Sequence, residues 1–200
     1  MKTSSSTAAR IRDVALGMIA EVGYAAISME DVRREANVSN GSLYHHFPSK
    51  AALAAGLYVD GMGQCQSIIL DALATSGDAH DGVERAVLEY LVWIDGHRDI
   101  ASLVFADLPD QVLLASEPDF STANRRYVDA VRRWLADHAR EGRIIDAPFE
   151  VVHALWIGPA QEYSRHWVRG RTRARPRRVA PDLAAAAWRS LRGDRGAPRG

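Results

Sequence analysis

The stretch Val38-Ser39-Asn40-Gly41-Ser42-Leu43-Tyr44-His45-His46-Phe47-Pro48-Ser49-Lys50 decides the fold. Ser39 can cap a short helix, because a serine side chain accepts a hydrogen bond from a backbone N–H of the first turn. Pro48 ends that helix, since the residue before a proline avoids the helical conformation. Leu43 and Phe47 are spaced to face a core, so the remaining polar and aromatic side chains are predicted to lie on the exposed face.

The residues upstream predict a second short helix and a tight turn. Ser28 is followed three residues later by Asp31, a capping-box pair in which each side chain can satisfy a backbone N–H. Asn37 stands at the turn, where asparagine adopts the left-handed backbone more readily than most residues. Two short helices joined by such a turn have the proportions of a helix-turn-helix motif, whose second helix enters the major groove of DNA.

The rest of the chain is predicted to be helical, which makes the protein all-α. Apolar residues recur at helical spacing over Thr7–Val22, and Gly23 ends that helix. Ser49 is expected to cap a long helix that runs to about Ala74. Beyond it, helices are expected at about Gly82–His97, Asp99–Asp107, Phe120–Glu141, Pro148–Val168 and Pro181–Arg192, with connections at Leu108–Asp119 and Gly170–Ala180. Pro159 lacks a backbone donor and is expected to kink its helix near residues 155–158.

The net charge of zero hides a strong asymmetry along the chain. Residues 1–50 carry six basic and five acidic side chains, residues 51–164 carry eight and eighteen, and residues 165–200 carry eleven and two. The acidic middle disfavours contact with DNA, so a DNA contact is expected elsewhere. The basic residues at the end are also typical of a solvated segment without a binding role.

The composition disfavours several classes of protein. The longest apolar runs are far shorter than the roughly 20 residues that span a bilayer, and the polar N-terminus has no secretory signal, so no membrane contact is expected. Cys65 is the single cysteine, which excludes an internal disulfide and favours a cytoplasmic location. Metal-ligand spacings, nucleophile–base pairs and glycine-rich phosphate loops are absent from the sequence, so no metal, cofactor or enzymatic activity is expected.

The run 38–50, followed by Ala51-Ala52-Leu53, strongly resembles the signature of the tetracycline-repressor (TetR) family. Residues upstream also match the family pattern: Ile11, Ala15, Gly23-Tyr24 and Ile27-Ser28-Met29-Glu30-Asp31-Val32. The resemblance therefore covers about residues 8–55. Asn37 stands where the family usually has glycine, and Arg33 where it often has alanine. The resemblance implies a three-helix, helix-turn-helix DNA-binding head at residues 1–50 and a helical effector-binding and dimerisation domain at residues 51–200.

The resemblance also implies which side chains contact DNA. Ser28 matches a phosphate-contacting hydroxyl, Tyr44 and His46 match contacts to the DNA backbone, and Lys50 matches a phosphate-anchoring lysine. The positions that read or closely approach bases are matched by Ser39, Asn40, Gly41, Ser42 and His45, and Arg33 can add a phosphate contact. The alternative is a purely structural role, because serines cap helices in any fold and Tyr44 can pack on the first helix.

For residues 51–200 the resemblance implies an effector pocket and a homodimer formed by the last two long helices. Aromatic and polar side chains on the predicted helices supply the candidates for the pocket: Met62, Cys65, Gln66, Trp93, His97, Phe105, Tyr127 and Trp156. The alternative for each is an ordinary place in the core, and His97 and His153 are then polar residues satisfied by their neighbours. The mixture of aromatic and apolar side chains favours a fairly large, mostly apolar ligand.

These features predict a DNA-binding transcriptional regulator. A homodimer is expected to hold a near-palindromic double-stranded operator with half-sites about 34 Å apart or a multiple of it. A small-molecule effector is expected to release the protein from the operator. The long helix after Ser49 would link the effector pocket to the DNA-binding head, with a coupling free energy between effector and operator binding of about 1–3 kcal/mol. Repression is favoured because occupying an operator needs no further partner, and activation by the same fold is an alternative. Another alternative is a nonspecific DNA-binding or architectural protein that uses the arginines of residues 171–178.

Overall fold

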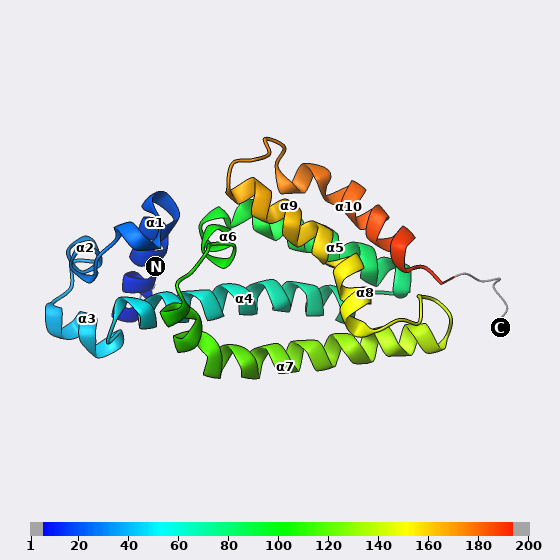
Figure 1. Cartoon of the computed structure of the whole chain (residues 1–200), viewed down its shortest axis with the longest axis horizontal. Helices are drawn as coiled ribbons and strands as arrows, with labels where there is room; N and C mark the ends of the chain where they lie inside the picture. The colour runs from blue at the N-terminus through cyan, green and yellow to red at the C-terminus, as the bar shows by residue number, and fades with distance from the viewer. Residues whose placement is uncertain (1–5, 194–200) are drawn as a thin grey trace, which may run out of the picture. The chain divides into compact units, whose positions relative to one another are not determined.

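The computed structural model describes residues 6–193, and all regular structure in that part of the chain is helical apart from one antiparallel bridge between Ile144 and Arg192. The all-α prediction is therefore confirmed. The chain divides into two compact units (Figure 1). Among the described residues, unit 1 holds residues 6–62 together with Arg98–Ser121, and unit 2 holds Gly63–His97 together with residues 122–193. This division by packing differs from a boundary at residue 50, which stays a prediction about function.

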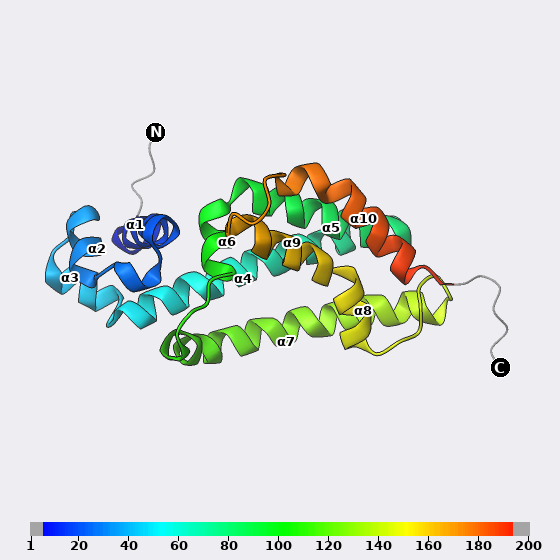
Figure 2. The same cartoon turned by 45° about the horizontal axis from the view of Figure 1, so that its top comes forward.

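Unit 1 contains the short helices at the N-terminus and a segment that returns to them. Its elements are α1 (Thr7–Val22), the 3-10 helix η1 (Tyr24–Ala26), α2 (Met29–Glu35), α3 (Asn40–His46), the first part of α4 (Lys50–Ala74), α6 (Arg98–Val104) and the start of α7 (Asp110–Arg140). Figure 2 shows α2 and α3 next to α1, and all three helices contribute to one core. Ile11, Val32, Leu43, Leu53 and Leu103 are fully or almost fully buried in that core. Leu103 belongs to α6, so α6 is part of the packing that holds the N-terminal helices.

Serine side chains cap α1 to α4, and Ser28, Ser39 and Ser49 do so as the sequence predicts. The hydroxyls of Ser6, Ser28, Ser39 and Ser49 accept hydrogen bonds from backbone N–H groups in the first turns of α1, α2, α3 and α4. Asn37, at the turn between α2 and α3, has a φ of 50°, a left-handed conformation that asparagine tolerates. The predicted boundaries of these helices are confirmed.

Unit 2 is built around two helices that lie side by side, α5 (Ala79–Gly96) and α10 (Pro176–Leu191) (Figure 1). The helix α10 buries Ala180, Ala184 and Ala187, whose small side chains let the neighbouring backbone approach closely. The helices α8 (Phe149–Trp156) and α9 (Gly158–Val168) and the later parts of α4 and α7 complete the unit. Trp156 on α8 is 1% exposed and its Nε1 donates to the carbonyl oxygen of Val83 on α5 at 3.0 Å.

Two boundary predictions are wrong and a third is confirmed. The stretch Leu108–Asp119, predicted to be a connection, is mostly helical, because α7 begins at Asp110 and continues through Pro118. The helix α10 begins at Pro176, a favourable first position, and also continues through Pro181, so the connection predicted to extend to Ala180 is wrong. At Pro159 the predicted disruption is confirmed, since α8 and α9 are separate helices divided at Ile157.

Among the described residues, no helix combines the length and the apolar character that crossing a membrane requires.

Candidate nucleic-acid interface

The helix α3 has one buried side and one side open to a partner. Leu43 is 0% exposed and anchors the helix in the core of unit 1. Tyr44 is 48% exposed, and Asn40, His45 and His46 are exposed as well. All ten residues predicted to contact DNA lie in unit 1, and none of them is buried. Their role in DNA contact remains a prediction.

Gly41 leaves open space on the surface of α3. A Cβ atom added there would meet no heavy atom within 4 Å, and the backbone does not have a positive φ. Glycine is a poor helix former, so neither packing nor backbone conformation within unit 1 requires it at this position. A partner surface that approaches the backbone closely would explain its presence.

Ser28 is occupied by its capping role. Its hydroxyl accepts from the backbone N of Asp31 at 3.1 Å and donates to the carboxylate Oδ2 of the same residue at 2.5 Å. The hydrogen bond from Ser28 lowers the pKa of Asp31, and Arg34 also contacts that carboxylate at 2.8 Å. A phosphate at Ser28 would therefore have to share a hydroxyl that the protein already uses.

Arg33 is likewise engaged inside unit 1. Its Nε and Nη2 donate to the two carboxylate oxygens of Glu30 at 2.8 and 2.7 Å, and its Nη1 donates to the carbonyl oxygen of Val38 at 3.2 Å. The hydrogen bond from Arg33 lowers the pKa of Glu30. Arg33 thus connects α2 to the turn before α3, and the phosphate contact predicted for it would compete with these bonds.

Lys50 fastens the start of α4 to the segment before α2. Its Nζ donates to the carbonyl oxygens of Ile27 at 2.8 Å and Ala25 at 3.3 Å, and it lies 4.4 Å from the centroid of the Tyr24 ring. An ammonium group has three donors, so one donor remains for a phosphate. Sequence reasoning gave Tyr24 no role at the site, although an aromatic residue directly after the glycine that ends α1 is the signal that could have drawn attention to it.

The eight residues predicted to line an effector pocket are divided between the two units. Cys65, Gln66, Tyr127 and Trp156 are buried in unit 2, whereas Met62 and Phe105 belong to unit 1. Trp93 is half-buried and His97 is exposed, and their rings stack with centroids 4.6 Å apart. The pocket role of all eight stays a prediction.

Unit 2 contains a cluster of polar side chains, buried except for the partly buried Asn124 and His153, which we call the polar cluster: Cys65, Gln66, Tyr90, Asn124, Tyr127, His153 and Ser164. The amide nitrogen of Gln66 donates to Oδ1 of Asn124 at 3.0 Å, and the hydroxyl of Tyr127 lies 3.3 Å from Nε2 of His153. Four of its members (Tyr90, Asn124, His153 and Ser164) were not predicted as site residues. The signal for them is a polar group within an otherwise apolar helical stripe.

Burial keeps the titratable members of the polar cluster uncharged near neutral pH. It raises the pKa of the Cys65 thiol to about 12, raises the pKa values of Tyr90 and Tyr127, and lowers the pKa of His153. Uncharged hydroxyl, amide and imidazole groups exchange hydrogen bonds with carbonyl or hydroxyl groups. The cluster therefore places neutral hydrogen-bonding groups in an otherwise apolar interior.

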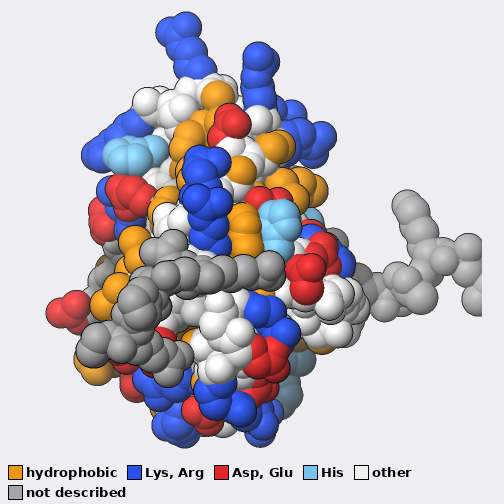
Figure 3. All heavy atoms as spheres, turned by 90° about the vertical axis from the view of Figure 1, so that its right-hand side faces the viewer, with side chains coloured by type: hydrophobic (Ala, Val, Ile, Leu, Met, Phe, Trp, Pro, Cys, Tyr) orange, Lys and Arg blue, Asp and Glu red, His pale blue; other side chains and the backbone are white. Residues whose placement is uncertain are grey.

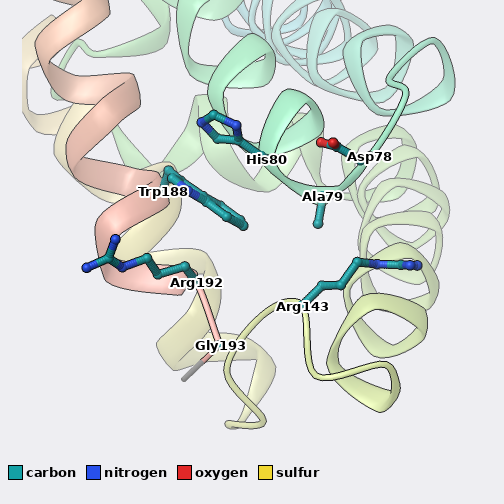
Figure 4. A pocket seen from close by; sticks show the side chains of 7 residues that line it. All are labelled: Asp78, Ala79, His80, Arg143, Trp188, Arg192 and Gly193. Atoms are coloured by element: carbon teal, nitrogen blue, oxygen red, sulfur yellow. The ribbon is translucent and has the colours of Figure 1, made fainter. Parts of the chain in front are cut away.

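A hollow of about 420 Å³ lies elsewhere in unit 2, between the start of α5 and the end of α10 (Figure 4). Trp188 and His80 form part of its wall, with ring centroids 4.8 Å apart. The guanidinium groups of Arg143 and Arg192 point in opposite directions, so they do not converge on one ligand group. None of the predicted pocket residues lines this hollow.

Figure 3 shows a face of the molecule on which basic and acidic side chains are interspersed with apolar ones.

Comparison with known proteins gives a consistent picture. A family model described as "Bacterial regulatory proteins, tetR family" matches residues 11–57. The chain is 27% identical over 134 residues to the HTH-type transcriptional repressor KstR2 of Mycobacterium tuberculosis, a match that covers 66% of this chain and 64% of the length of KstR2.

Solved structures share the fold along almost the whole chain. The fatty acid degradation regulator FadR from Bacillus halodurans is 17% identical with a TM-score of 0.78, covering 96% of this chain and 100% of the other. FadR from Bacillus subtilis, solved in complex with stearoyl-CoA, is 16% identical with a TM-score of 0.74, covering 90% and 97%. The residues that form the helix-turn-helix of unit 1 thus match the tetR family of bacterial regulatory proteins, and the solved structures share the all-helical fold.

Proposed function

We propose that the protein is a DNA-binding transcriptional repressor, in which α3 of each subunit of a homodimer reads one half-site of a near-palindromic operator. The observation that carries the proposal is the exposed face of α3, where Asn40, Tyr44, His45 and His46 surround the open space at Gly41. Donors and acceptors on a rigid helix can read base edges, while hydroxyl and imidazole groups can hold phosphates.

A candidate surface for dimerisation lies on α8 and α9. Val151 and Leu155, one helical turn apart on α8, are 47% and 40% exposed, and Pro159 follows them at the same spacing on α9. Exposed apolar side chains at such a spacing are typical of a helix that packs on a partner. We therefore place this stripe in the homodimer interface.

The effector is proposed to bind in unit 2 at the polar cluster. Its neutral hydrogen-bonding groups and apolar surroundings favour an effector whose buried part is large and mostly apolar, with a few neutral polar groups. The stearoyl-CoA bound to FadR from Bacillus subtilis is a molecule with a long apolar part, which makes acyl-CoA compounds suitable first candidates. Effector binding is proposed to favour a disposition of the two heads that does not fit the operator.

The proposal is tested by binding the purified protein to DNA from immediately upstream of its own gene, in the presence of excess unrelated DNA. Sequence-selective binding as a dimer is the expected result, and addition of the effector should release the DNA. Affinity that is equal for all sequences and falls steeply with salt would instead favour a nonspecific DNA-binding protein.

The dimer surface has its own test. Leu155→Arg places a charge on the exposed stripe and should convert the dimer to a monomer in sedimentation, with an unchanged helical circular dichroism spectrum. Ala136→Arg changes an exposed alanine on α7, outside the stripe, and is the matched control. A Leu155→Arg protein that still sediments as a dimer would contradict the interface.

A further inference from the structure

The connection between α9 and α10 concentrates positive charge. Residues 169–178, which we call the basic segment, contain six arginines and no acidic residue. Many arginines on the other helices have a carboxylate partner, as Arg12 has Asp60 and Arg132 has Glu150. The basic segment therefore stands apart from the charge pairing seen on those helices.

The basic segment is held in place by specific contacts. Gly170 has a φ of 69°, and the backbone N of Arg171 donates to the carbonyl oxygen of His166 at 2.9 Å, which closes the end of α9. The hydroxyl of Tyr163 donates to the carbonyl oxygen of Ala174 at 2.8 Å and lies 3.2 Å from the hydroxyl of Thr172. These contacts limit how far the arginines can move away from one another.

Two of the six arginines have an internal partner. The carboxylate of Asp95 on α5, whose side chain is 0% exposed, lies 2.8 Å from Nη2 of Arg175 and 2.5 Å from Nε of Arg177. One carboxylate thus faces two guanidinium groups. Asp95 anchors the start of α10 without neutralising the basic segment.

Three further arginines are exposed and have no partner of this kind. Within residues 6–193, the side chains of Arg171, Arg173 and Arg178 make no hydrogen bond or ion pair with another residue of the chain. Like charges on a constrained segment repel one another, and an anion that binds them relieves the repulsion. A guanidinium group forms paired hydrogen bonds with a phosphate, so phosphate is the anion that this arrangement suits best.

We propose that Arg171, Arg173 and Arg178 bind the phosphate groups of a small-molecule effector, a diphosphate or polyphosphate ester that also carries an apolar group. This inference rests on the proposed function and specifies the chemistry of its effector. The basic segment and the polar cluster belong to the same unit, whereas the residues predicted to contact DNA all lie in the other. For this reason a small molecule is favoured over DNA as the source of the phosphates.

The probes are coenzyme A, which carries a diphosphate and a third phosphate, and inorganic pyrophosphate, each titrated into the full-length protein by calorimetry at low salt. The variant is the triple Arg171→Gln, Arg173→Gln, Arg178→Gln. Its matched control is the triple Arg125→Gln, Arg126→Gln, Arg133→Gln, which removes the same charge from exposed positions on α7 in unit 2. Circular dichroism and sedimentation verify that both variants remain folded.

The wild-type protein is expected to bind both probes, coenzyme A more tightly because it has more phosphate groups. Loss of three charge-assisted contacts should weaken coenzyme A binding roughly 100-fold in the first triple variant, whereas the control should change it less than about threefold. Absence of binding by the wild-type protein, or equal weakening by the two triple variants, would overturn the inference. A variant that loses affinity for DNA and keeps its affinity for coenzyme A would overturn it as well, because the segment would then contact DNA.

The two proposals fail in distinguishable ways. A protein that binds its operator selectively and ignores both probes contradicts only the inference about the basic segment. A protein that binds coenzyme A through the three arginines and selects no DNA sequence contradicts the proposed function and leaves the phosphate site standing.

Discussion

Replacing Asp95 by asparagine tests how firmly α10 is fastened to α5. The carboxylate oxygens of Asp95 accept hydrogen bonds from Nε of Arg175 at 2.9 Å and from Nε of Arg177 at 2.5 Å, and the side chain is 0% exposed. Nη2 of Arg175 also donates to the backbone carbonyl oxygen of Asp95 at 3.3 Å. In the Asp95→Asn variant the two arginines still have a polar neighbour, but that neighbour no longer carries a negative charge.

The size of the effect follows from the exposure of the three groups. Removing one partner of a fully buried ion pair costs about 3–5 kcal/mol, because the other charge is left without compensation. The side chains of Arg175 and Arg177 are 60% and 57% exposed, so water can solvate them when the carboxylate is lost. We therefore expect Asp95→Asn to lower the free energy of unfolding by about 2 kcal/mol, below the fully buried case.

The assay is urea unfolding at neutral pH, followed by circular dichroism. Asp182→Asn, at an exposed position on α10, is the matched control and should change the free energy of unfolding by less than about 0.5 kcal/mol. A cost for Asp95→Asn no larger than that of the control would refute the reasoning.

The pH dependence gives a second readout for Asp95. Burial alone would raise the pKa of Asp95. The hydrogen bonds and charges of Arg175 and Arg177 together lower it by more, so the net pKa lies below the ordinary value of 3.8. The stabilisation is then complete above that ordinary value and is lost as the pH falls through the lowered pKa of the folded state. The difference between wild type and Asp95→Asn should shrink over the same range of pH.

Three further predictions concern the head and the polar cluster. Gly41→Ala should raise stability by up to about 1 kcal/mol and weaken operator binding at least tenfold, measured by urea unfolding and DNA titration, whereas Gly17→Ala on α1 should leave DNA binding unchanged. Lys50→Ala should weaken DNA binding and also lower the free energy of unfolding by about 1–2 kcal/mol, because two backbone carbonyl groups lose their donor, while Tyr44→Ala should affect DNA binding alone. The pKa of His153 is lowered by burial, so the unfolded chain takes up a proton first as the pH falls below about 6.5 and stability declines there. His153→Phe should reduce that decline in urea unfolding between pH 7 and 5, and an identical decline in both proteins would contradict it.

The N-terminal helices were predictable because their signals are local. Ser28, Ser39 and Ser49 each lie one residue before the helix that they cap, and Asn37 forms its turn with its immediate neighbours. Such signals act within a few residues, so the sequence pattern alone places the helix boundaries.

The later helices depended on contacts that the local sequence does not contain. Pro118 and Pro181 look like helix breakers, yet both lie inside helices. In α7, Val112 and Ser116 lie one turn apart and are both buried. Their packing holds the part of the helix that comes just before Pro118. The contacts of Asp95 with Arg175 and Arg177 join residues about 80 positions apart, and no spacing in the sequence indicates that pairing.

The predicted DNA contacts raise a different difficulty, since the residues that match the family pattern also hold unit 1 together. Ser28 caps α2, Arg33 binds Glu30 and the carbonyl group of Val38, and Lys50 ties α4 to the carbonyl groups of Ala25 and Ile27. A motif of this kind therefore records the requirements of folding together with those of DNA binding, and loss of DNA affinity in a variant does not by itself distinguish the two.

Tyr44 and Gly41 are free of this ambiguity. The Tyr44 side chain is 48% exposed, and a Cβ atom at Gly41 would meet nothing within 4 Å. A change at either position that weakens DNA binding without lowering the free energy of unfolding must act through the partner. These two positions, rather than the charged residues of the motif, are where the DNA-binding role of α3 can be separated from its structural role.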